Sequence, residues 1–147
     1  MQRALPVIAG LIWAVSVIYA GQQVLVPIGL IQPALMGSLF APGLILAAMI
    51  GRTMIGHKSE ASGAIDQAVV QDTLRQIVLG LCIWPLVGFF LGVGLVLCLG
   101  AGLAFARLIY WFGAHRSPAI ALFGATATFA PTLFVAVMAV SRLAFGN

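Results

Sequence analysis

The residues best suited to chemistry in this chain are a few polar side chains that lie inside otherwise apolar sequence. Arg107 and Tyr110 lie three residues apart near the end of a long apolar run, so they share one face if that run is a helix. Asp72, Arg75 and Gln76 have a similar spacing in the preceding run. Charged groups inside a membrane helix are costly, which indicates that these side chains have partners or a ligand inside the molecule.

Two interpretations of these polar residues stay open at this point. In the first, Asp72 pairs with Arg75 or Arg107, and the ion pair fixes how the helices pack. In the second, the arginines form a cationic pocket for an anionic ligand, because arginines outnumber aspartates in this part of the chain. The charged residues concerned are Arg52, Arg75, Arg107 and Arg116, with Asp66 and Asp72.

The composition is that of an integral membrane protein. Of 147 residues, 63% are hydrophobic and only 7% are charged, whereas a soluble domain has roughly 25% charged residues. Residues 4–50, 76–106 and 117–141 contain no Asp, Glu, Lys or Arg, and each run exceeds the roughly 18 apolar residues that a membrane helix needs. Because these runs do not alternate between polar and apolar residues as barrel strands do, we predict an all-α membrane protein with a single domain, 1–147.

Turn residues divide the chain into five predicted membrane helices. They cover residues 1–20, 34–54, 66–87, 91–114 and 118–145, with a reversal at 21–33, a polar loop at 56–63 and a hairpin near 87–92. Residues 1–20 also fit a secretory signal peptide, with Arg3 before an apolar stretch and Ala20 at its end. Because apolar residues resume at Val24, we favour a retained helix.

The basic residues predict the orientation in the membrane. With five helices, Arg3, the loop after Arg52 and the segment 107–116 fall on one side, and Arg142 falls on the other. Positively charged loops stay in the cytoplasm, so we expect a cytoplasmic N-terminus, with a bacterial inner membrane as the location.

Several other classes of function have no support in the sequence. It contains no Gly-rich phosphate loop, no nucleophile elbow, and no His/Cys set spaced to hold a metal. Basic clusters with interleaved aromatic residues are also absent, so we expect no nucleic-acid partner. Cys82 and Cys98 lie in apolar runs and are typical of small buried hydrophobic residues. His115, Arg116 and the pair Tyr110-Trp111 are also typical of anchors at the membrane interface.

The segment 105–117 resembles a motif of the MAPEG family, the membrane-associated proteins of eicosanoid and glutathione metabolism. The motif reads Ala-Arg-x-x-Tyr, then a small-residue turn and a further basic residue, and here Arg107, Tyr110 and Arg116 occupy those positions. The segment 70–76 resembles the Gln-Asn-Thr-x-Glu-Gln element of bacterial members, and Arg52 matches the arginine that closes the first family helix. The resemblance covers about residues 34–145 and implies a four-helix bundle (33–147) preceded by an extra N-terminal helix and turn (1–32).

The resemblance also implies an activity. Members of the family are homotrimers that bind glutathione as a co-substrate at subunit interfaces and take a lipophilic small molecule from the bilayer. It therefore implies a glutathione-dependent transferase or peroxidase, in which Arg116 or Tyr110 stabilises the thiolate. The residues that it assigns to glutathione binding are Arg52, Asp72, Arg75, Gln76, Arg107 and Tyr110.

Four positions depart from the family pattern. Asp72 and Arg75 replace an Asn and a Glu, Ala114 replaces a second tyrosine, and Ala121 falls where an arginine activates the thiol in the family. These departures support an alternative, a non-catalytic membrane scaffold protein of the same fold. A small transporter or channel subunit ranks third, because no predicted helix is polar along its full length.

Overall fold

The computed structural model describes residues 4–55 and 60–146. In this part of the chain it contains no strands, so the prediction of an all-α protein is confirmed. All five of its long helices have the length and apolar composition to cross a membrane, and large apolar side chains are exposed along each of them. The helices are α1 (Ala4–Gln23), α2 (Ile31–Ile55), α3 (Glu60–Phe90), α4 (Val93–Arg116) and α5 (Pro118–Phe145), with a short 3₁₀ turn, η1 (Ile28–Leu30), before α2.

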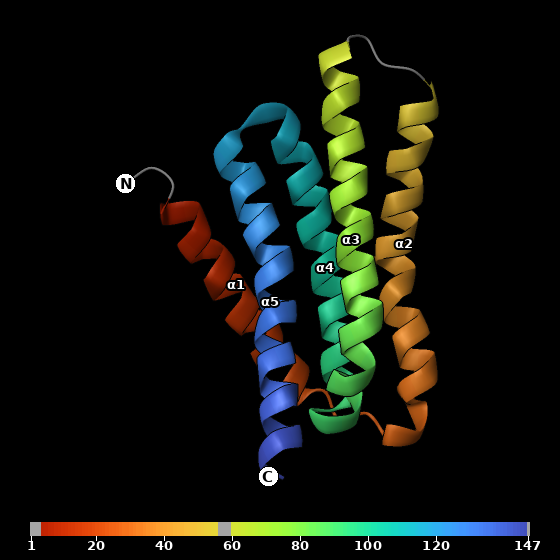
Figure 1. Ribbon diagram of the computed structural model, residues 1–147, viewed down its shortest axis with the longest axis vertical. Helices are drawn as coiled ribbons and strands as arrows, with labels where there is room; N and C mark the ends of the chain where they lie inside the picture. Colours follow the sequence, from red (N-terminus) through yellow and green to blue (C-terminus); the bar gives the residue numbers. More distant parts are fainter. Residues whose placement is uncertain (1–3, 56–59, 147) are drawn as a thin grey trace.

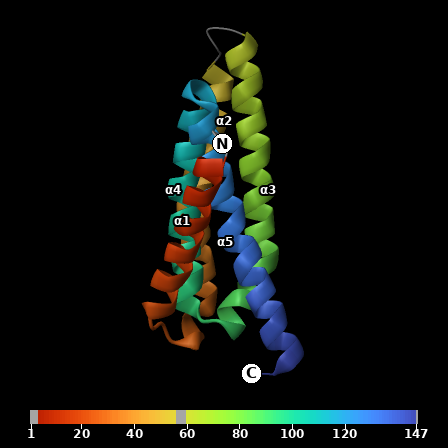
Figure 2. The same ribbon diagram turned by 90° about the vertical axis from the view of Figure 1, so that its left-hand side faces the viewer.

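The helices run alternately up and down and form one bundle (Figure 1). The end of α2, the start of α3, the end of α4 and the start of α5 lie together, and the C-terminus lies at the opposite end. We call the end where these four helix ends meet the charged end, because it holds Arg52, Asp66, His115 and Arg116. Arg142 belongs to the last turn of α5, at the opposite end. The turned view shows α3 on one side of the bundle and α1 and α4 on the other (Figure 2).

Helix α4 is the centre of the bundle. It packs against all four other long helices, and it is the most buried of the five. Two glycines explain how closely its neighbours approach: a Cβ at Gly94 would collide with the Val24 carbonyl, and a Cβ at Gly100 with the Ser38 carbonyl. Small residues allow such contacts between membrane helices, so α4 holds its position through its backbone as well as its side chains.

Helix α1 is packed as part of this bundle. Its Gly10 lies against Thr126 of α5, its Gly21 lies against Leu95 of α4, and Val17 belongs to the apolar core. This packing is what a retained first helix requires, and the retention of residues 1–20 stays a prediction.

Several predicted helix boundaries were wrong. Helix α1 ends at Gln23 instead of residue 20, and α4 covers Val93–Arg116 instead of 91–114. Helix α2 begins at Ile31 instead of residue 34, and α3 begins at Glu60 instead of residue 66, while residues 56–59 of the predicted loop lie outside the described residues. Of residues 60–65 only Gly63 strongly disfavours a helix, so α3 extends past the apolar run. Helix α3 also continues to Phe90, and the turn into α4 is short because Gly92 adopts a φ of 113°, which favours glycine.

Candidate functional site

One face of α4 carries the polar side chains that contact α3. Arg107, Trp111 and His115 follow one another at four-residue spacing, so they form a stripe along the last turns of α4. Helix α3 offers two carboxylates to this stripe, Asp66 and Asp72. Because α3 and α4 run in opposite directions, Asp72 meets the start of the stripe and Asp66 meets its end.

The first contact is an ion pair between a buried arginine and an aspartate whose side chain is 35% exposed. Arg107 Nη1 donates to Asp72 Oδ2 at 2.6 Å, and Arg107 Nη2 donates to Thr128 Oγ1 of α5 at 3.0 Å. The Arg107 side chain is only 1% exposed, and its guanidinium group lies 5.0 Å from the centre of the Tyr110 ring. We call Asp72, Arg107 and Thr128 the Asp72 cluster. It joins three helices, and it leaves Arg107 no exposed surface to offer a ligand.

The second contact gathers three side chains around the Asp66 carboxylate, which is 1% exposed. Asp66 Oδ2 lies 3.1 Å from Arg52 Nε of α2, and Asp66 Oδ1 accepts a hydrogen bond from Trp111 Nε1 at 2.9 Å. His115 Nε2 lies 2.7 Å from the same Oδ1 atom, and the Arg52 guanidinium lies 5.5 Å from the centre of the Trp111 ring. We call Arg52, Asp66, Trp111 and His115 the Asp66 cluster. Its basic members keep exposed surface, 51% for the Arg52 side chain and 23% for His115.

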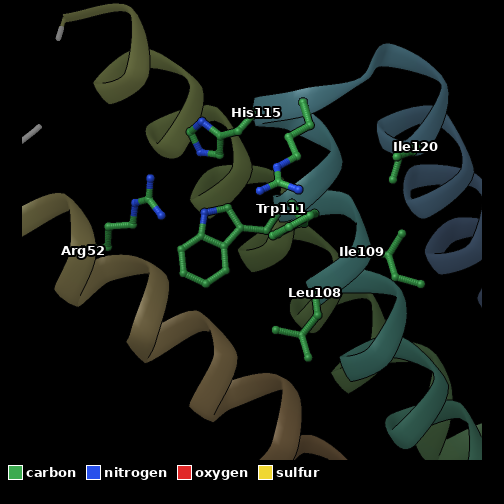
Figure 3. A pocket seen from close by; sticks show the side chains of 8 residues that line it. Arg52, Leu108, Ile109, Trp111, His115 and Ile120 are labelled. Carbon is green, nitrogen blue, oxygen red and sulfur yellow. The ribbon is translucent and has the colours of Figure 1, made fainter. Parts of the chain in front are cut away.

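A pocket of about 750 Å³ opens beside the Asp66 cluster. Figure 3 shows Arg52 on α2 at one side of it and Ile120 on α5 at the other, with Trp111 and His115 between them. Three of its lining residues can carry a positive charge, and the other five are aromatic or aliphatic. The lining residues are Arg52, Leu108, Ile109, Trp111, Phe112, His115, Arg116 and Ile120.

Arg116 is the basic residue of the pocket that no carboxylate neutralises. Its guanidinium group lies 4.2 Å from the centre of the Phe112 ring, and among the described residues no Asp or Glu pairs with it. The pocket therefore offers one uncompensated arginine, a second arginine and an imidazole beside apolar walls. This combination can hold a negatively charged group through charge-assisted hydrogen bonds.

The structure divides the predicted glutathione-binding residues between several places. Arg52 and the predicted catalytic residue Arg116 line the pocket, whereas Arg107 and Asp72 form the buried ion pair. Gln76 is buried one turn from Asp72, with no hydrogen-bond partner for its Oε1 atom among the described residues, and Arg75 is exposed on α3. Tyr110 lies against Arg107 and does not line the pocket. Asp72 thus pairs with Arg107, one of its two possible partners, and not with Arg75.

The Asp66 cluster was not predicted as a unit. Asp66 is separated in sequence by 45 residues from Trp111 and by 49 from His115, so no local spacing connects them. The sequence did contain one signal for this cluster. Residues 107, 111 and 115 share a helix face, and the chain has only two aspartates, both before them, that could pair with that face. Of the two positions that depart from the family pattern in this region, Ala114 is half-buried and Ala121 packs against Gly113.

The pocket lining suits binding better than covalent chemistry by the protein itself. Among the described residues that line it there is no Ser, Thr, Cys or Lys, so none of these supplies a nucleophile. Within residues 4–55 and 60–146, no three His, Cys, Asp or Glu side chains gather to hold a metal ion. No protein-family model, no curated protein and no solved structure matches the chain. The resemblance to the MAPEG family therefore stays a prediction from its motifs.

Proposed function

We propose that this membrane protein binds an amphipathic anion in the pocket at the charged end of the bundle. One observation carries the proposal: the same pocket joins Arg52, His115 and Arg116 to apolar walls. Leu108, Phe112 and Ile120 are 47%, 57% and 42% exposed on the outside of an apolar bundle, so a lipophilic group reaches them from the bilayer. The head group of such a ligand lies against the basic residues, and its apolar part lies along the walls.

Glutathione, with a lipophilic substrate, is the candidate ligand that the MAPEG resemblance supplies. Its carboxylates match Arg52 and Arg116, and a cation beside its sulfur favours the thiolate, the form that attacks an electrophile. In this proposal Arg116 stabilises the thiolate and Arg52 binds a carboxylate. In the homotrimer that the resemblance implies, the exposed Arg75 is available to a neighbouring subunit. The activity is that of a glutathione-dependent transferase or peroxidase.

A glutathione titration of the detergent-solubilised protein tests this proposal. We expect saturable binding at millimolar glutathione, with an increase in thiolate absorbance. Arg116→Ala should lower the affinity roughly tenfold or more, because it removes a charge-assisted contact. Arg142→Ala is the matched control, because it removes an arginine from the other end of the bundle, and it should leave the affinity unchanged. Absence of binding to the wild-type protein contradicts the glutathione proposal.

A non-catalytic scaffold protein is the second candidate, and the Asp72 cluster favours it. This cluster holds three helices together. Two of its members, Asp72 and Arg107, are residues that the family resemblance assigns to glutathione binding. A scaffold protein of the same fold that has lost glutathione chemistry predicts a stable bundle that binds no glutathione. The same titration therefore separates the two candidates.

The orientation also belongs to the proposal. We propose that the charged end faces the cytoplasm of a bacterial cell, because it holds the basic loops and helix ends. A reporter enzyme that is active only outside the cytoplasm should then be active when fused after residue 147. If the same reporter is active after residue 57 and inactive after residue 147, the protein has the opposite orientation.

A further inference from the structure

We infer that Asp66 sets the charge of the ligand that this pocket accepts, and that the preferred head group carries one negative charge. The inference rests on the pocket of the proposed function. It adds the charge class of the ligand, an amphipathic monoanion, and it assigns a specificity-determining role to a residue that does not itself line the pocket.

The geometry places the Asp66 carboxylate directly behind the pocket wall. Asp66 contacts three lining residues: Arg52 at 3.1 Å, Trp111 at 2.9 Å and His115 at 2.7 Å. Because Asp66 is 1% exposed, it does not reach the ligand, although its negative charge lies one side chain away from it. Asp66 is therefore a positioning residue for both basic side chains of the cluster, and it is also part of the pocket's electrostatics.

Among the described residues, the charges at the pocket sum to one positive charge when His115 is neutral. Arg52 and Arg116 each contribute one positive charge and Asp66 contributes one negative charge, while His115 is charged only if it is protonated. Asp72 is paired with the buried Arg107, so the two cancel, and Glu60 at the start of α3 is exposed to solvent. A neutral head group gives Arg116 no counter-charge, and a dianion places an excess negative charge beside the apolar walls, so a monoanion fits best.

The apolar walls define the rest of the ligand. Leu108, Ile109, Phe112 and Ile120 extend the pocket away from its basic residues, and three of them are exposed to the bilayer. The chemical class that matches both halves is a long-chain carboxylate or another lipid-soluble amphiphile with a monoanionic head group.

Trp111 supplies a local reporter for such a ligand, because it lines the pocket. Bromine atoms on the alkyl chain of a bound carboxylate should quench the fluorescence of Trp111. A Trp111→Phe variant gives the background signal from Trp13 and Trp84. The two probes are a chain-brominated dodecanoate, a monoanion, and a dodecyl phosphate with the same brominated chain, which carries a charge of about −1.5 to −2 near neutral pH. All titrations use neutral-detergent micelles at one pH.

We expect the wild-type protein to bind the carboxylate more tightly than the phosphate. Asp66→Asn keeps an oxygen acceptor for Trp111 and His115 but raises the net charge of the pocket by one. The ratio of the two affinities should therefore shift toward the phosphate, roughly tenfold for one charge at this distance. The double variant Arg52→Gln/Asp66→Asn has the wild-type net charge and should regain the wild-type ratio. Arg142→Gln is the control: it changes the charge by one unit at the opposite end of the bundle, and the ratio should stay unchanged.

Each outcome decides the inference. An unchanged ratio in Asp66→Asn overturns it, as does a shift of equal size in Arg142→Gln. Absence of quenching in the wild-type protein overturns both the inference and the amphipathic-anion pocket, whereas failure of glutathione alone to bind overturns only the glutathione proposal. If Asp66→Asn does not fold, Arg52→Gln is tested instead, because Arg52 is half-exposed. Its pocket has no net charge, so carboxylate affinity should fall roughly tenfold, and an unchanged affinity overturns the inference.

Discussion

The two aspartates of α3 meet the same face of α4, yet their surroundings give them different tasks. Asp72 pairs with an arginine that is 1% exposed, and Thr128 takes up a further hydrogen bond from that arginine. Asp66 is itself buried, but its partners Arg52 and His115 keep exposed surface and line a pocket. The comparison teaches that the exposure of the paired cation decides the role of each aspartate. An aspartate that pairs with a buried cation holds helices together. A buried aspartate that pairs with exposed cations can position them for a ligand.

The largest expected effect comes from breaking the buried pair. Asp72→Ala leaves the Arg107 guanidinium buried without its counter-charge. We expect a loss of about 3 kcal/mol in the free energy of unfolding, the lower end of the effect for a buried pair, because the Asp72 side chain is itself 35% exposed. The measurement is unfolding of the detergent-solubilised protein, followed by circular dichroism.

A double variant separates the buried charge from the packing. Asp72→Leu with Arg107→Leu removes both charges, and such replacements of a buried pair are often neutral or stabilising. We therefore expect most of the lost stability to return. If the double variant is as unstable as Asp72→Ala, the stability lost in Asp72→Ala does not come from the unpaired charge of Arg107.

A smaller effect is expected where α4 and α5 approach each other near the pocket. A Cβ at Gly113 would collide with the backbone of Ile120 and Ala121, so Gly113→Ala should cost about 1–3 kcal/mol through overpacking. Gly37→Ala is the matched control, because no atom lies within 4 Å of its added Cβ, and it should be neutral or slightly stabilising. Equal unfolding free energies for the two variants would contradict this packing of α4 on α5.

A substitution in the Asp66 cluster should cost still less stability. Trp111→Phe removes the hydrogen bond to Asp66 and keeps an aromatic ring, so we expect a loss of about 1 kcal/mol. The cost stays well below that of Asp72→Ala because Arg52 and His115 still contact the carboxylate. A larger loss than in Asp72→Ala would show that the Asp66 cluster contributes more to stability than the Asp72 cluster.

The smallest effect on stability should come from Arg116→Ala. Arg116 is exposed and contacts the Phe112 ring, so its removal should change the unfolding free energy by less than about 0.5–1 kcal/mol. The same variant should lower the affinity for an amphipathic anion roughly tenfold. A large loss of stability without a change in affinity would make Arg116 a structural residue.

The sequence predicts the helices better than the contacts between them. Long uncharged runs define five membrane helices, and Pro118 after Ser117 places the start of α5 correctly. The start of α3 was misplaced because Glu60, Ser62 and Gly63 interrupt the apolar pattern, although only Gly63 strongly disfavours a helix. Arg107 with Asp72 was one of the pairings that the spacing allowed. The Asp66 cluster was harder to predict, because it joins three helices whose rotation about their own axes depends on close packing at glycines such as Gly100.

The most direct test of the account is a crystal structure of the protein grown with the chain-brominated dodecanoate, with anomalous scattering data collected at the bromine absorption edge. The account predicts bromine peaks beside Leu108 and Phe112, the carboxylate head group at Arg116 and Arg52, and an unchanged Arg107–Asp72 pair. Bromine peaks only elsewhere on the bundle, such as the groove that Leu133 and Phe134 line between α1 and α5, would contradict it.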